Sequence, residues 1–122
     1  MGPDRAAVLK LLKARGFKAR RGHLRLAVGE LFWYVDLRID GVGPSASLLL
    51  EVGCWTPLLP PEPDGGAVDC PLLVDVPVSA GADVEALVER VSGVGTLAVL
   101  RESVGELPGV LVDRRLRELL GT

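Results

Sequence analysis

The chain has 122 residues, of which 48% are apolar and 25% are charged, and its formal net charge is −2. This composition is typical of a globular domain with a hydrophobic core and excludes an intrinsically disordered chain, and the length predicts a single domain over residues 1–122. Every apolar run ends before the roughly 18 residues that a transmembrane helix needs, so we expect no membrane partner and a cytoplasmic location.

The charged residues are segregated along the chain. Residues 1–25 contain eight lysines and arginines and one acid, whereas residues 26–89 contain eleven acids and a single base, Arg38. Two interpretations follow from this pattern. The two regions attract each other within the fold, or one of them binds a partner of opposite charge.

The first predicted element is a helix over residues 4–15. Val8, Leu11 and Leu12 fall on one helical face, Asp4 can cap the first free N–H groups, and Gly16 ends the helix.

Four predicted strands follow, each with alternating apolar and polar residues. Their ranges are residues 23–28, 31–40, 46–54 and 72–78. Gly29 and Glu30 connect the first two strands as a hairpin, and residues 41–45 make the next turn. Residues 56–69 are rich in proline, so they form a long loop rather than a strand inside a sheet. Pro77 places the last strand at a sheet edge or close to a strand end.

The last third of the chain predicts helices. Asp83 can cap a helix that Gly93 ends, and a final helix covers residues 110–120. Residues 96–101 fit either a fifth strand or one helical turn. These elements predict an α+β fold, in which an antiparallel sheet of four or five strands carries an N-terminal helix and C-terminal helices on one face. We expect the other face to be mixed and partly solvated, because it carries Phe32, Tyr34, Asp36, Arg38, Glu51 and Asp75.

The residue types argue against several kinds of catalytic site. A nucleophilic triad needs a histidine as base, and the single histidine, His23, stands among arginines at a strand start, where an exposed or capping role is favoured. Asp36 and Asp40 alternate with Arg38 in the pattern of a solvated strand face, and no phosphate-binding glycine motif occurs. We therefore predict no catalytic residue and no cofactor, and we favour a protein that is not an enzyme.

Cys54 and Cys70 flank the proline-rich loop. They lie too far apart for the CxxC spacing of a zinc site, so we predict no metal. We expect reduced thiols, with a loop-closing disulfide worth about 3 kcal/mol as the alternative.

Two segments are candidate binding surfaces. The first is a basic patch that could contact phosphates, formed by Lys18, Arg20, Arg21 and Arg25. The second is an apolar partner surface around the proline-rich loop and the mixed sheet face, formed by Trp55, Leu58, Leu59, Phe32 and Tyr34. Apolar loop residues such as these either fold back over the sheet or anchor a partner.

The opening of the chain resembles a known family. Leu9-Lys10, then Gly16-Phe17-Lys18 and Arg20-Arg21-Gly22 before a strand of basic and apolar residues, are similar to a bacterial family of domains of unknown function, number four-three-zero-four. The resemblance implies a helix, several strands and a helical end similar to residues 83–120. It implies no activity and no catalytic residue.

Three functional hypotheses remain open. The leading hypothesis is a cytoplasmic interaction protein whose acidic surface matches a basic protein partner, in the manner of an immunity protein or antitoxin. The second is nucleic-acid binding through the basic patch, which the overall pI near 5.4 disfavours. The third is a small enzyme with a pocket between sheet and helices. The sequence does not indicate an oligomeric state.

Overall fold

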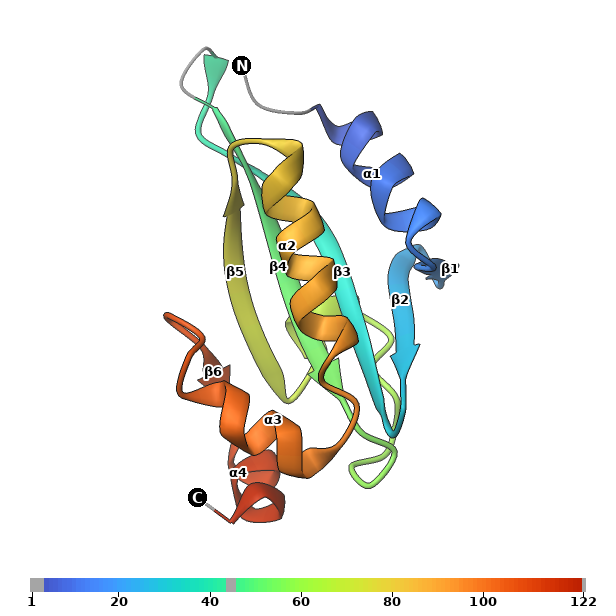
Figure 1. Ribbon diagram of the computed structural model, residues 1–122, viewed down its shortest axis with the longest axis vertical. Coiled ribbons are helices and arrows are strands. Elements are labelled where there is room, and N and C mark those ends of the chain that lie inside the picture. Colours follow the sequence, from blue (N-terminus) through green and yellow to red (C-terminus); the bar gives the residue numbers. More distant parts are fainter. Residues whose placement is uncertain (1–3, 44–45, 122) are drawn as a thin grey trace.

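A computed structural model describes residues 4–43 and 46–121 of the chain. Its centre is a six-stranded antiparallel sheet in which the strands lie side by side in chain order (Figure 1). The strands are β1 (Lys18–Arg20), β2 (His23–Val28), β3 (Leu31–Asp40), β4 (Ser47–Trp55), β5 (Leu72–Val78) and β6 (Leu111–Val112). The predicted α+β class and antiparallel sheet are confirmed.

In the part of the chain that the structure describes, four helices and the short 3-10 turn η2 accompany the sheet. They are α1 (Arg5–Ala14), α2 (Gly81–Ser92), α3 (Leu97–Val104), α4 (Arg114–Leu120) and η2 (Gly66–Asp69). Helices α1 and α2 lie across the same face of the sheet, and α3 and α4 gather near β6 (Figure 1). None of the helices within residues 4–43 and 46–121 is long and apolar enough to cross a membrane.

The register places the apolar strand positions in rows beneath α1 and α2. Leu24, Val35, Val52 and Val74 are direct neighbours across four strands, and all four are buried. Because side chains alternate along a strand, the same register sends every second residue to this face. The hydrophobic core therefore lies between the sheet and the helices, as the strand periodicity predicts.

The predicted hairpin at Gly29 and Glu30 is confirmed by the pairing of Val28 with Leu31. The predicted turn at residues 41–45 includes Pro44 and Ser45, which lie outside the described residues. Pro77 lies beyond the part of β5 that pairs with β6, so its edge position is also confirmed. A proline there protects an open edge, because it offers no N–H to another strand.

Several predicted boundaries differ from the structure. Strands β1 and β6 were not predicted, because three and two residues are too few to show an alternation. Of residues 96–101, which by sequence fit either a strand or a helical turn, residues 97–101 belong to α3, and the Thr96 hydroxyl caps its first turn. The last helix starts at Arg114 rather than at residue 110, because residues 111 and 112 pair with β5 and Asp113 caps the helix.

The start of α2 also differs from the prediction. The helix begins at Gly81, so Asp83 lies in its first turn instead of preceding it. Its carboxylate accepts hydrogen bonds from the backbone N–H groups of Ser79 at 2.7 Å and Ala80 at 3.0 Å. These bonds hold the pKa of Asp83 below its ordinary value.

Part of the second sheet face is covered by the proline-rich loop. Tyr34, Trp55, Ala67 and Cys70 form a small buried cluster between this face and the loop. The close approach requires glycine at position 53, because a Cβ there would lie 2.7 Å from the Ala67 carbonyl oxygen. The expectation of a partly solvated face holds only farther along the sheet, where the exposed Arg38 lies.

Candidate functional site

The predicted basic patch is paired with acids inside the chain. Arg25 Nε lies 2.9 Å and Arg20 Nε 3.3 Å from a carboxylate oxygen of Glu62 in the loop. Arg21 Nε lies 3.2 Å from a carboxylate oxygen of Asp64. Three of the four patch residues therefore hold the loop, and only Lys18 of the four has no acid partner among the described residues. This pairing fits the first of the two interpretations of the charge segregation, in which the two regions attract each other within the fold.

Tyr34 extends the same network into the buried cluster. Its hydroxyl donates a hydrogen bond to Glu62 and accepts one from Arg20 at 3.2 Å. Burial, which is the largest cause, acts together with the hydrogen bond to Glu62 and the charge of Glu62 to raise the pKa of Tyr34 to about 12. Arg25 also lies 4.0 Å above the ring of Phe32, within the range of a cation–π contact.

His23 and Asp36 anchor the loop at a second point. His23 Nδ1 lies 2.6 Å from one carboxylate oxygen of Asp36, and the other oxygen accepts a hydrogen bond from the Ala67 N–H at 2.9 Å. The prediction that Asp36 and Asp40 share a solvated face is wrong for Asp36, because η2 covers it. Asp36 holds η2 on the sheet.

The thiol of Cys70, which lies near Asp36, is not activated for nucleophilic chemistry. Burial is the main cause that raises the pKa of Cys70 to about 12, and the charge of Asp36 raises it as well. A thiol with this pKa stays protonated at neutral pH. The other cysteine, Cys54, is buried on the helix-covered face, and both thiols are free, as expected. This region therefore fits a structural role.

The predicted apolar partner surface is mostly buried. Trp55, Leu59 and Tyr34 are buried, and Phe32 packs against Trp55 with ring centroids 5.5 Å apart. The Trp55 indole N–H donates a hydrogen bond to the Leu59 carbonyl at 2.8 Å. Of the five residues, only Leu58 is exposed. They therefore do not form one exposed surface, because the loop folds back over the sheet and buries its own apolar side chains.

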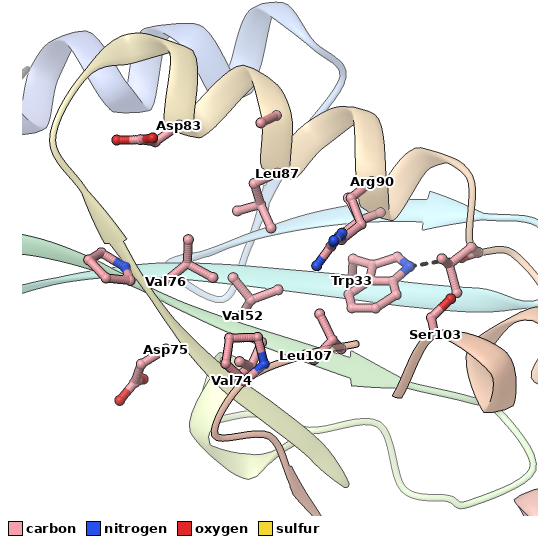
Figure 2. Close-up of a pocket in the computed structure, with 15 residues that line it drawn as sticks. Trp33, Val52, Val74, Asp75, Val76, Asp83, Leu87, Arg90, Ser103 and Leu107 are labelled. Carbon is pink, nitrogen blue, oxygen red and sulfur yellow. Dashed lines mark hydrogen bonds between the residues drawn. The ribbon is translucent and has the colours of Figure 1, made fainter. Parts of the chain in front are cut away.

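A cavity of about 390 Å³ lies on the other face, between α2 and strands β4 and β5 (Figure 2). Val52, Val74 and Val76 form its floor, and Leu87 faces them from α2. Trp33 forms part of the wall, and its indole N–H donates a hydrogen bond to the Val94 carbonyl at 3.0 Å. The remaining lining residues are Asp75, Pro77, Asp83, Ala86, Arg90, Val91, Val94, Ser103, Leu107 and Pro108.

Short side chains leave this space open. Valines line the floor, and the nearby helix position holds Ala86, so these short side chains leave space between β5 and α2. The third sequence hypothesis expected a pocket between sheet and helices, but it named none of these residues as its lining. The available signal was the pair of valines in β5 together with an alanine in α2, but periodicity indicates only that such positions face each other.

Most polar groups that line the cavity already have partners. Asp83 accepts the two backbone N–H groups described above, and Ser103 Oγ donates to the Val99 carbonyl at 2.8 Å. Asp75 is directed away from the cavity in Figure 2 and lies 3.4 Å from Arg38. Arg90 extends from α2 toward the cavity beside Trp33 (Figure 2). Its guanidinium makes no hydrogen bond or ion pair with any residue in the described part of the chain.

Among residues 4–43 and 46–121, no group of three His, Cys, Asp or Glu side chains is placed to hold a metal ion. No protein-family model, no curated protein and no solved structure matches this chain. The resemblance carried by Gly16-Phe17-Lys18 therefore remains an expectation, and the function has to be argued from the geometry.

Proposed function

We propose that the protein is a non-enzymatic binding protein that holds a small, largely apolar ligand in the cavity between α2 and β5. The observation that carries this proposal is the cavity itself, whose volume of about 390 Å³ falls within the usual range of small-molecule sites. Protein interiors are otherwise close-packed, so a space of this size beside the core is available to a ligand.

The position of the titratable groups favours binding over catalysis. His23, the single histidine, lies on the opposite face of the sheet and is bonded to Asp36. It does not line the cavity, and neither does either thiol. The carboxylate of Asp83 is occupied by backbone N–H groups, which makes it a poor general base.

Binding of a basic protein partner is the second candidate function, and the internal ion pairs make it less favoured than ligand binding. Much of the acid-rich region is paired internally, since Glu62 and Asp64 bind the arginines of residues 20–25 and Glu85 and Glu89 bind Arg15. These acids are less available to a partner, which weakens the immunity-like hypothesis. The cavity does not depend on them.

Nuclear magnetic resonance of the two tryptophan indole N–H groups tests the proposal, with 1-octanol as an uncharged probe. Trp33 lines the cavity, whereas Trp55 lies on the other face and serves as an internal control. We expect octanol to shift the Trp33 signal in a saturable manner and to leave the Trp55 signal in place.

A matched pair of variants separates cavity binding from general adhesion. Ala86→Phe places an aromatic ring at the cavity, and Ala82→Phe makes the same change at an exposed position of α2 that does not line it. We expect Ala86→Phe to weaken octanol binding at least about tenfold, the effect of losing roughly 1.4 kcal/mol of contact, and Ala82→Phe to bind like the unmodified protein. Absence of a saturable Trp33 shift, or equal binding by both variants, would refute the proposal.

A further inference from the structure

Arg90 places a positive charge at the cavity. It lies in the last turn of α2 and belongs to the residues that line the cavity. In the described part of the chain it has no acid partner, which is also true of the exposed Arg101, and it differs from Arg101 in that it lines the cavity. A guanidinium offers several N–H donors in a planar fork that matches a carboxylate.

We infer that the ligand is a small amphipathic carboxylic acid, whose apolar part fills the cavity and whose carboxylate pairs with Arg90. The inference rests on the proposed function, because it assigns the charged end of the same ligand. The valine floor and Leu87 suit the apolar part, and Arg90 lies where a ligand held there would meet solvent.

The two acids that line the cavity do not prevent this arrangement. Asp75 is directed to the second sheet face, where Arg38 offsets its charge. Asp83 lies at the opposite end of α2, seven residues before Arg90, which corresponds to roughly 10 Å along a helix axis. Asp75 and Asp83 nevertheless make the surroundings of Arg90 more negative. A singly charged head group is therefore favoured over a phosphate dianion.

A second explanation for Arg90 is that it stabilises α2 by its position in the last turn, where a positive charge interacts favourably with the helix dipole. Arg101 provides the matched control, because it occupies the last turn of α3 and does not line the cavity. A purely helical role predicts that neither arginine affects ligand choice.

The test compares octanoate, 1-octanol and octylamine at neutral pH by the shift of the Trp33 indole signal. We expect octanoate to bind about tenfold more tightly than octanol, the factor that corresponds to one charge-assisted hydrogen-bonded contact. Arg90→Gln should remove this preference while octanol binding is retained, Arg90→Lys should keep part of it, and Arg101→Gln should keep all of it.

The possible results distinguish the two proposals. Equal binding of octanoate and octanol, an octanoate preference that survives in Arg90→Gln, or tighter binding of octylamine would overturn the inference and leave the proposed function standing. If none of the three probes binds, both proposals fail. The octanoate preference should also decrease with added salt, because Arg90 is exposed and its charge is screened.

Discussion

The helix-covered face of the sheet buries a large set of aliphatic side chains, whereas the loop-covered face combines a small buried cluster of Tyr34, Trp55, Ala67 and Cys70 with a partly exposed network of charged hydrogen bonds. The two faces share strands, so Tyr34 and Val35 are adjacent in sequence but belong to different environments. Both residues are fully buried. Helices α1 and α2 cover the first face by apolar contacts. The loop is held on the second face by the ion pairs of Glu62 with Arg20 and Arg25.

Because different interactions hold the two faces, equally buried residues on them do not need equal free energy to become exposed. Burial of apolar area stabilises the helix-covered face without reference to charge. Partly exposed ion pairs contribute less, and their contribution depends on pH and salt. We therefore expect the loop to open locally at a lower free energy than the helices separate from the sheet.

The largest expected effect comes from the helix-covered face. Leu50 is fully buried at the centre of the sheet, between Leu37 and Val76. Leu50→Ala should lower the free energy of unfolding by about 2–5 kcal/mol, because it removes buried methyl groups and leaves a cavity. Urea denaturation measures this loss. The control, Leu119→Ala on the more exposed side of α4, should cost less than about 1 kcal/mol, and a comparable loss in both variants would contradict the prediction.

A smaller effect is expected from the loop-covered face. Glu62→Gln removes the negative charge that faces Arg20, Arg25 and the Tyr34 hydroxyl, so it should lower the free energy of unfolding by about 1–3 kcal/mol. The matched control is Glu118→Gln, which breaks an exposed pair with Arg114 and should cost about 0.3–0.5 kcal/mol. Urea denaturation of the three proteins provides the comparison.

The two thiols show which face responds to Glu62→Gln. Burial raises the pKa of both cysteines, so alkylation at neutral pH requires the protein to open. Cys70 lies under the loop and Cys54 lies in the helix-covered core. We expect iodoacetamide to label Cys70 faster, and the ratio of the two rates to increase in Glu62→Gln. Equal rates for both cysteines would show that the loop opens only when the whole protein unfolds.

The sequence predicted the helix-covered face better than the loop-covered face, for a physical reason. Burial against helices repeats every second residue along a strand, so the alternation around Val35 and Val52 reports it directly. The ion pairs of Glu62 connect residues about forty positions apart and repeat with no period. Charge segregation predicted that attraction in general but did not identify its partners.

The residues that line the cavity escaped prediction for a different reason, although the third hypothesis expected a pocket between sheet and helices. Periodicity indicates that Val74 and Leu87 both face the core, but the space between them depends on how far α2 lies from β5. Arg90 follows the polar pattern of an exposed helical residue, and its charge in the last turn of α2 interacts favourably with the helix dipole. Its relation to the cavity depends on tertiary packing, which a single sequence does not specify.

The pH dependence of Tyr34 gives the most specific test of the loop-covered face. The ordinary pKa of tyrosine is 10, and in the folded protein burial, followed by Glu62, raises it to about 12. Between these values the unfolded chain has lost a proton that the folded protein keeps. The free energy of unfolding should therefore fall as pH rises through this interval, by up to about 1.4 kcal/mol per pH unit, with no such loss below pH 10.

Tyr34→Phe should lack this component of the pH dependence, since phenylalanine does not ionise. Because Tyr34 is the single tyrosine of the chain, the near-ultraviolet absorbance of tyrosinate reports its ionisation directly. In Glu62→Gln we expect the Tyr34 pKa to fall toward 10 but to stay above it, because burial, the larger cause, remains. Tyrosinate that forms near pH 10 in the unmodified folded protein would mean that water reaches the hydroxyl, and that the loop does not close this face of the sheet.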